Sequence, residues 1–235
     1  PRKEQGGAIQ AVLDGRSELK PRKEGQISGA FGFRMGASLI RDIQGGEREA
    51  RPFDDVYGDG WAPEVQFLYE YQPWHSETWG NFGFIGSFGL SFFNGFGRFK
   101  HQLINENVTP AVDFPIQSQT RFNFFQVPVM VGGVIRLNTL RYIRPFVMAG
   151  PMGIAFFESR NDDKSGSRGF SKALFVSAGI SIPLDWLSST SSWDLYRSFG
   201  IHQYYLTIDY SKVTTIASEV SFDVSGASAG LTFEF

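Results

Sequence analysis

One feature limits what this chain can fold into more than any other: bulky apolar residues alternate with small or polar residues over most of its length. In the stretch SGASAGLTFEF at 225–235, Ala, Leu and Phe occupy the odd positions from 227 onward, while Ser, Gly, Thr and Glu occupy the even ones. A period of two residues is typical of a β-strand whose two faces have different surroundings. The pattern therefore predicts a strand that runs to Phe235.

The same alternation recurs in seven earlier segments, at about residues 27–40, 63–73, 80–93, 121–135, 144–157, 171–183 and 201–211. In each segment one parity carries the bulky apolar side chains, and the other is largely Gly, Ala and Ser with a few charges. A face of small residues fits the crowded inside of a narrow closed barrel, whose bulky face then points into lipid. The sequence thus predicts an all-β fold, an eight-stranded antiparallel up-and-down transmembrane β-barrel, rather than a soluble barrel or sandwich.

The bulky parity is assigned to the outside in every segment. In segment 144–157 this assignment turns five side chains outward: Phe146, Met148, Met152, Ile154 and Phe156. Aromatic rings are expected at both membrane interfaces, because they suit the boundary between headgroups and hydrocarbon. The expected periplasmic belt is Phe31, Phe33, Tyr69, Tyr71, Phe82, Phe84, Phe146, Tyr204, Phe233 and Phe235. The expected outer belt is Phe92, Phe125, Phe156, Tyr210 and Phe222.

Composition excludes several classes of protein. The chain has 24 Phe and 27 Gly, yet its mean hydropathy is −0.17, and no run approaches the roughly 18 apolar residues of a transmembrane helix. A net charge of −2 gives no reason to expect nucleic acid as a partner. The absence of cysteine excludes a disulfide scaffold and thiolate metal sites.

The eight alternating segments and the closing GLTFEF resemble the small eight-stranded bacterial outer-membrane β-barrel proteins, such as the transmembrane domain of OmpA and the OmpX and OmpW types. The resemblance covers about residues 27–235. It implies a porin-like membrane protein of the Gram-negative cell envelope, in contact with outer-membrane lipid and lipopolysaccharide. It also implies that the barrel-assembly machinery reads Leu231, Phe233 and Phe235 as an insertion signal.

The lengths of the connections indicate the orientation of the barrel. Connections at about 42–62, 94–120, 158–170 and 212–221 are long, whereas those at about 74–79 and 136–143 are short. Outer-membrane barrels have short periplasmic turns and longer loops outside. With an even number of strands, both termini are therefore expected on the periplasmic side.

Two segments fall outside the strand pattern. Residues 1–26 are charged and Gly-rich, and we expect a polar periplasmic segment that is disordered, a plug or a docking peptide. The stretch 185–200 predicts a short helix capped by Ser192 and ended by Gly200. It either lies at the periplasmic interface or closes the mouth of the barrel. The residues expected to contact the interface are Trp186, Trp193, Leu195, Tyr196 and Phe199.

The inward parity predicts a polar network in the lumen, made of Arg34, Glu64, Gln66, Glu70, Gln126, Asp209 and Glu234. Buried charges must be paired, so Arg34 is expected beside Glu70 or Asp209. The network could line a gated polar path or form a salt-bridged plug. We expect the plug, because eight strands leave an interior that side chains just fill.

Signals for chemistry are weak. His75 and Ser76 are adjacent, so on a strand they point opposite ways, and only His101 falls in an outer loop. Asp162 and Asp163 match no Ca²⁺-binding loop, so we expect no metal, no cofactor and no catalysis. The connection 94–120 is unusually apolar, which suggests a loop that binds a ligand or a partner. Its apolar residues include Phe96, Phe99, Ile104 and Phe114.

The sequence therefore predicts a noncatalytic outer-membrane barrel with a plugged lumen. It would act as a structural anchor, an adhesin or a member of an envelope complex, with a protein partner bound through residues 1–26 or 185–200. The alternative is a narrow OmpW-like transporter or channel for small apolar molecules. A gap in the barrel wall, or an apolar path through it, would favour that alternative.

Overall fold

A computed structural model describes residues 28–45, 51–52, 61–76, 78–99, 116–138, 142–161, 166, 168–184, 189–216 and 220–235. Eight long strands account for most of these residues: β1 (Ser28–Gly45), β3 (Trp61–Ser76), β4 (Gly80–Phe99), β5 (Ile116–Leu137), β6 (Arg144–Arg160), β7 (Arg168–Pro183), β8 (Gln203–Thr215) and β9 (Val220–Glu234). The short β2 (Arg51–Pro52) pairs with β1, and a helix, α3 (Ser189–Phe199), follows β7.

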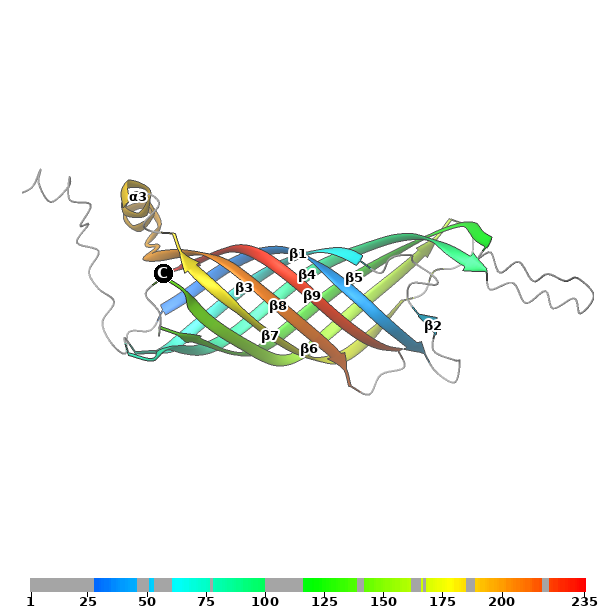
Figure 1. Ribbon diagram of the computed structural model, residues 1–235, viewed down its shortest axis with the longest axis horizontal. Helices are drawn as coiled ribbons and strands as arrows, with labels where there is room; N and C mark the ends of the chain where they lie inside the picture. Colours follow the sequence, from blue (N-terminus) through cyan, green and yellow to red (C-terminus); the bar gives the residue numbers. More distant parts are fainter. Residues whose placement is uncertain are drawn as a thin grey trace, which may run out of the picture.

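Each long strand pairs antiparallel with the next one along the chain, and β9 pairs with β1, so that the sheet closes on itself (Figure 1). The closing register runs from Ala30 opposite Glu234 to Gly45 opposite Val220. The predicted fold class, a closed eight-stranded antiparallel up-and-down barrel with a short helix, is confirmed. Ser28 and Phe235 lie at one end of the barrel, the terminal end, and the opposite end is the far end (Figure 1).

Alternation places small and polar residues inside the barrel, as predicted for seven of the eight segments. On β1, for example, Arg34 is 1% exposed whereas the adjacent Met35 is 58% exposed. On β8, Asp209 is buried between the exposed side chains of Ile208 and Tyr210. Neighbouring residues of a strand point to opposite faces, so one correct assignment orients a whole strand.

The assignment of segment 144–157 is wrong. Phe146 is 2% exposed and Val147 is 50% exposed, so β6 turns the opposite parity inward. The side chains predicted to face outward that in fact lie inside are Phe146, Met148, Met152, Ile154 and Phe156. Phe146 and Phe156 therefore leave the predicted aromatic belts, and the exposed Phe157 replaces Phe156 in the outer one.

Large side chains fit inside at β6 because the next strand presents glycine to them. A Cβ added at Gly179 would lie 2.7 Å from Cζ of Phe146, and one at Gly169 would lie 2.3 Å from Cζ of Phe156. The two rings thus fill space that the missing side chains of β7 leave open. Size alone could not orient β6, because its other parity is apolar as well, with Val147, Ala149 and Phe157 in this segment.

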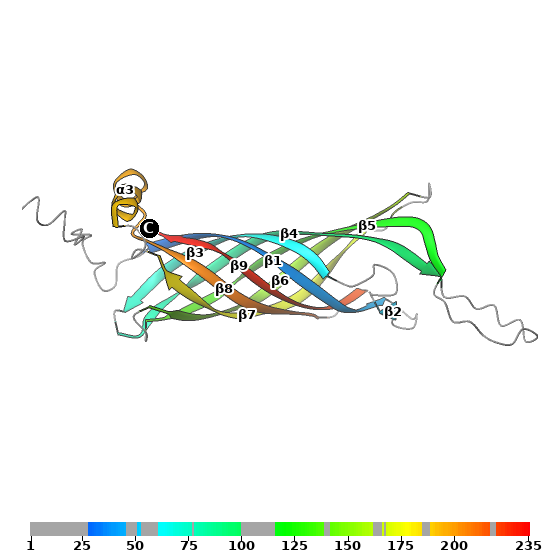
Figure 2. The same ribbon diagram turned by 45° about the horizontal axis from the view of Figure 1, so that its top comes forward.

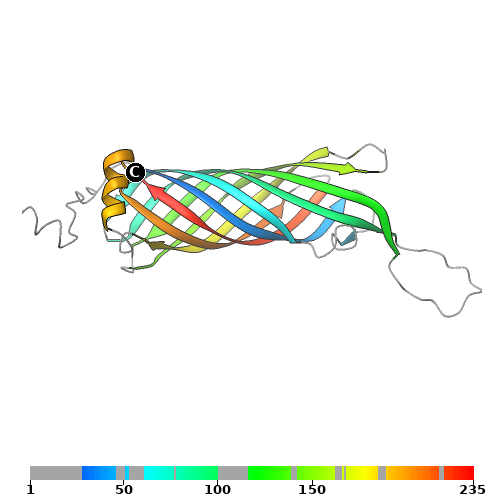
Figure 3. The same ribbon diagram turned by 90° about the horizontal axis from the view of Figure 1, so that it is seen from above.

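The strands are longer than predicted at the far end. β4 continues to Phe99 and β5 begins at Ile116, so Phe96 and Phe99 belong to a strand rather than to the predicted loop 94–120. This hairpin projects beyond β8 and β9 at the far end (Figure 3). Ile104 and Phe114 lie outside the described residues. β8 and β9 are separated only by residues 216–219, so the predicted long connection 212–221 is short.

Exposed aromatic side chains occur toward both ends of the wall. Those toward the far end are Trp61, Phe92, Phe125, Phe157, Phe170 and Tyr210. Those toward the terminal end include Tyr71, Trp74, Trp79, Tyr142 and Phe235. The side chain of Phe222 lies outside the described part of the chain. Within that part, no helix has the length and apolar character needed to cross a membrane.

The helix α3 begins at Ser189, so Ser192 lies in its first turn and is not the cap that the sequence suggested. Gly200 follows the helix with a φ of 71°, and its N–H donates to Tyr196 O at 2.9 Å, as predicted for a residue that ends a helix. Figures 1 and 2 show α3 at the terminal end, outside the outline of the barrel. In Figure 3 its axis runs across the barrel axis.

Candidate functional site

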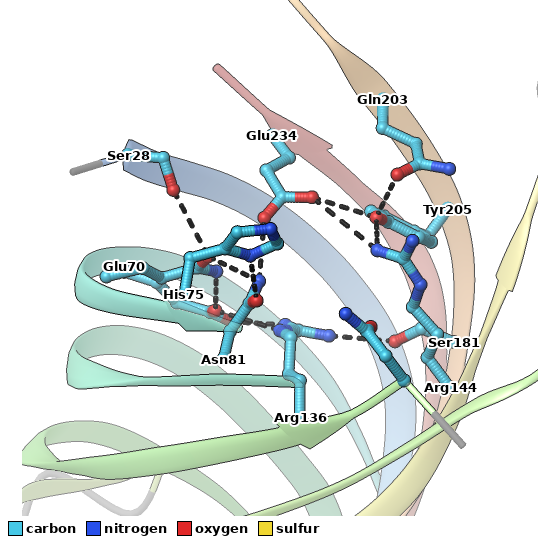
Figure 4. A network of polar contacts seen from close by, with 12 residues as sticks. Ser28, Glu70, His75, Asn81, Arg136, Arg144, Ser181, Gln203, Tyr205 and Glu234 are labelled. Atoms are coloured by element: carbon cyan, nitrogen blue, oxygen red, sulfur yellow. Dashed lines mark hydrogen bonds and ion pairs between the residues drawn. The ribbon is translucent and has the colours of Figure 1, made fainter. Parts of the chain in front are cut away.

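The interior of the barrel is the candidate site, because period-two alternation delivers polar side chains from several strands into one narrow space. In the terminal half of the lumen, an ion pair joins Arg136 of β5 and Glu70 of β3 (Figure 4). Nε of Arg136 donates to Glu70 Oε2 at 3.0 Å, and the second terminal nitrogen of the guanidinium contacts Oε1. The other terminal nitrogen of the same guanidinium donates to Ser181 Oγ at 2.8 Å. This two-point geometry is the strongest that Arg and carboxylate form.

A second group of contacts surrounds Glu234 of β9. Its Oε1 accepts from Asn81 Nδ2 at 3.0 Å, and its Oε2 lies 2.8 Å from the hydroxyl of Tyr205 (Figure 4). Arg144 contacts the same hydroxyl and lies 3.9 Å from Glu234 Oε2. The Tyr205 hydroxyl also lies 2.7 Å from Oε1 of Gln203. These residues come from four strands and bridge the lumen at its terminal end.

The next level toward the far end holds the ion pair of Arg34 with Asp209, at 3.1 Å. Ser177 and Ser228 donate to the two oxygens of Asp209 at 2.8 and 2.7 Å. The ring of Phe146 lies 5.2 Å from the guanidinium of Arg34 and 5.1 Å from that of Arg136. Such cation–π distances are favourable. Because β6 turns Phe146 inward, the ring of Phe146 contacts both arginines.

A small cavity of about 20 Å³ follows beyond Arg34. Its polar lining includes Glu64, Gln66, Ser91 and Gln126. Glu64 accepts from Ser38 Oγ and from Gln66 Nε2, and Ser91 Oγ donates to Gln126 Oε1 at 3.3 Å. The space is too small for anything much larger than one water molecule.

Three inward phenylalanine rings, on β4, β5 and β6, lie beyond this cavity. The ring centroids of Phe93 and Phe124 lie 6.0 Å apart, and those of Phe124 and Phe156 lie 5.9 Å apart. All three rings are buried. From the terminal end toward the far end, these inward side chains are therefore charged, then polar, then apolar.

All seven residues predicted for the lumen point inward. Arg34 lies beside Asp209, one of the two predicted partners, whereas Glu70 pairs with Arg136. The prediction missed Arg136, Arg144 and Tyr205 as members of the network. Arg136 has the inward parity of β5, so extending segment 121–135 by one residue would have found it. Arg144 could have been predicted only if the inward parity of β6 had been assigned correctly.

His75 and Ser76, which are adjacent in the sequence, make separate contacts in the structure. His75 Nδ1 lies 2.5 Å from Asn81 Oδ1, and Ser76 Oγ accepts from the N–H of Thr78 at 3.3 Å, so the two side chains are engaged separately. No group of three or more His, Asp or Glu side chains among the described residues could hold a metal ion. His101, Asp162 and Asp163 lie outside these residues.

Of the five residues predicted to contact the interface, the structure describes the side chains of Leu195, Tyr196 and Phe199. Phe199 is 73% exposed, and the ring of Tyr196 lies 5.0 Å from that of His202. Leu195 is partly buried. Trp186 and the side chain of Trp193 lie outside the described part.

No family model matches this chain, and no curated protein matches it. It is similar to several solved structures. Ail, the attachment invasion locus protein of Yersinia pestis, is 14% identical, with 88% of this chain and 99% of that chain covered and a TM-score of 0.44. Neisserial surface protein A is 12% identical, with coverages of 88% and 99% and a TM-score of 0.44. The outer membrane protein OprG from Pseudomonas aeruginosa is 13% identical, with coverages of 90% and 98% and a TM-score of 0.48. Similarity at this level concerns the fold alone.

Proposed function

We propose that this chain is a noncatalytic outer-membrane β-barrel whose lumen is plugged by side chains, and that it works as a structural anchor, an adhesin or a member of an envelope complex. The observation that carries the proposal is the pairing of Arg136 with Glu70 and of Arg34 with Asp209 inside the lumen. Paired and hydrogen-bonded charges are costly to separate, so they block passage.

The outer surface supports the membrane location. The middle of the wall exposes apolar side chains such as Val131 at 65%, Val129 at 48% and Phe84 at 52%. A soluble protein rarely exposes so large an apolar area, whereas a membrane barrel requires it. Lipid and lipopolysaccharide would cover this surface, and both termini would lie in the periplasm.

The terminal end would hold the binding site for a protein partner. Phe199 projects from α3 with 73% of its surface exposed, and β1, which the polar segment 1–26 precedes in the sequence, begins at the same end. An exposed aromatic side chain is a frequent anchor in protein interfaces. A partner in the periplasm would contact α3 and residues 1–26 together.

The test is single-channel conductance of the purified protein in a planar bilayer. Wild-type protein should insert without steady conductance, because the ion pairs occupy the lumen. The Arg34→Ala variant should conduct, either steadily or in brief openings. The substitution removes one ion pair from the lumen and leaves Asp209 without its arginine. Steady conductance of the wild type that changes in the variant would contradict the plugged barrel and favour a lumen path.

A second candidate, a narrow transporter for small apolar molecules, is favoured by a seam in the wall, a break in the registered pairs between β4 and β5. The registered pairs between β4 and β5 run to Phe88 opposite Val129 and resume at Ser91 opposite Gln126. Residues 89–90 and 127–128 between them lack registered pairs, and Pro128 has no N–H to donate. Pro128 also lines the cavity in the lumen, so the weak seam lies beside interior space.

A disulfide across the seam tests this candidate. Leu90→Cys combined with Val127→Cys would lock the seam, and uptake of a small apolar compound into cells should then fall and recover on reduction. The matched control is Phe92→Cys combined with Phe125→Cys, at a registered pair of the same two strands. Equal uptake in the oxidised and reduced seam variant would exclude passage at this point.

A further inference from the structure

Glu64 differs from the other carboxylates of the lumen. Three of them meet an arginine: Glu70 meets Arg136, Asp209 meets Arg34, and Glu234 meets Arg144. Within the described residues, Glu64 has no cation beside it and accepts hydrogen bonds only from Ser38 and Gln66. A carboxylate inside a barrel that is not balanced by a positive charge is electrostatically costly.

The cavity of about 20 Å³ lies directly beside this carboxylate. Besides Glu64, the polar residues that line this cavity, here called the chamber, are Gln66, Gln126, Ser91, Ser38 and Ser211. Apolar residues such as Met152, Ile154 and Phe175 complete the lining. A space of this size holds one particle of the size of a water molecule.

Gln126 brings a buried, unpaired polar atom to the chamber. The side chain is 5% exposed, its Oε1 accepts from Ser91, and its Nε2 has no hydrogen-bond partner among the residues that the structure describes. Buried polar groups are nearly always hydrogen-bonded, so the unpaired Nε2 indicates a ligand in the chamber. A half-turn of the amide keeps the contact with Ser91, whose hydroxyl can accept as well as donate, and turns Oε1 into the chamber.

We propose that this chamber binds one small monovalent cation, of the class of Na⁺, which balances the charge of Glu64. The ligands would be the Glu64 carboxylate, the amide oxygens of Gln66 and Gln126, and the hydroxyl of Ser91. A divalent cation fits less well, because Ca²⁺ and Mg²⁺ sites depend on more oxygen ligands or on several retained waters. A water molecule alone would satisfy Gln126 but would leave the charge of Glu64 unbalanced.

The first experiment compares thermal unfolding of the purified barrel in NaCl and in choline chloride at equal ionic strength. Choline is too large for the chamber, so the comparison separates binding from screening. A ligand that binds only the folded state shifts the folding equilibrium by about tenfold when it is present at about ten times its Kd. The wild type should therefore unfold at a clearly higher temperature in NaCl. Equal unfolding temperatures in the two salts would overturn the proposal and leave a water molecule as the occupant.

Variants assign the effect to the chamber. Glu64→Gln should lose the difference between the two salts and unfold in choline chloride no earlier than the wild type, because no unbalanced charge remains. Gln126→Met, which keeps the volume, should reduce the difference. Asp223→Asn is the control, because Asp223 is an exposed acid 4.0 Å from Lys212 and should keep the full difference. A full sodium effect in Glu64→Gln, or its loss in Asp223→Asn, would contradict the proposal.

Discussion

Gly29 and Phe235 exchange two backbone hydrogen bonds: Gly29 N–H donates to Phe235 O at 3.0 Å, and Phe235 N–H donates to Gly29 O at 2.9 Å. The ring of Phe235 covers the face of Gly29, where an added Cβ would lie 2.8 Å from the ring. The same ring lies 6.4 Å from that of Tyr69. The aromatic residue therefore packs over the seam that closes the barrel.

Replacing the ring at this seam should impair assembly. Phe235→Ala keeps the backbone bonds but removes the contacts with Gly29 and Tyr69, so a smaller fraction of the protein should reach the folded state. The folded barrel should migrate faster than boiled protein on a gel, and this faster band measures the yield. Phe84→Ala, an exposed ring away from the closing seam, is the control. An unchanged yield in Phe235→Ala would show that the ring is incidental to closure.

The ion pair of Arg136 and Glu70 should show strong coupling. Arg136→Met leaves a buried carboxylate without its partner and should lower the free energy of unfolding by about 3–5 kcal/mol. The double variant Glu70→Leu/Arg136→Met should lose much less than the sum of the two single changes. Urea unfolding in lipid vesicles measures these values in a double-mutant cycle.

The exposed pair of Lys212 and Asp223 provides the comparison. Their side chains are 60% and 47% exposed and lie 4.0 Å apart. An exposed pair contributes about 0–1 kcal/mol, so Lys212→Ala should change stability little. Similar losses at both pairs would contradict the view that burial in the lumen gives the Arg136 pair its importance.

Glycines of the closing seam should not tolerate a side chain. A Cβ at Gly230 would lie 2.0 Å from Phe33 O and 2.6 Å from Arg34 Cα, so Gly230→Ala should destabilise the barrel by about 1–3 kcal/mol. At Gly86, on the outer face, the nearest atom would lie 4.0 Å away. Gly86→Ala should therefore be neutral or slightly stabilising when unfolding in urea is compared. Equal losses at both positions would mean that crowding at the seam is not the cause.

The orientation of β6 can be read from single cysteines in this cysteine-free chain. Val147→Cys should react with a lipid-soluble thiol reagent, because Val147 is 50% exposed on the outer wall. Phe146→Cys should be protected, because Phe146 is 2% exposed inside the barrel. Reaction at position 146 and protection at 147 would reverse the orientation given by the structure.

The sequence by itself determined the number of strands, their alternation and the members of each face, because side chains of a strand alternate whatever the strand pairs with. It also indicated which face is inside wherever the two parities differ clearly in size, as on β1 with Arg34 and Met35. On β6 both parities are apolar, so the sequence pattern could not orient the strand.

Only the tertiary structure decided which large residues fit inside and which charges meet. Phe146 and Phe156 occupy the lumen because Gly179 and Gly169 on β7 leave room for them. Arg136 meets Glu70 across 66 positions of sequence, and Glu64 meets no described arginine, because the register of strands around the closed barrel sets the height of each inward side chain. Register is a property of the closed sheet, and local alternation carries no information about it.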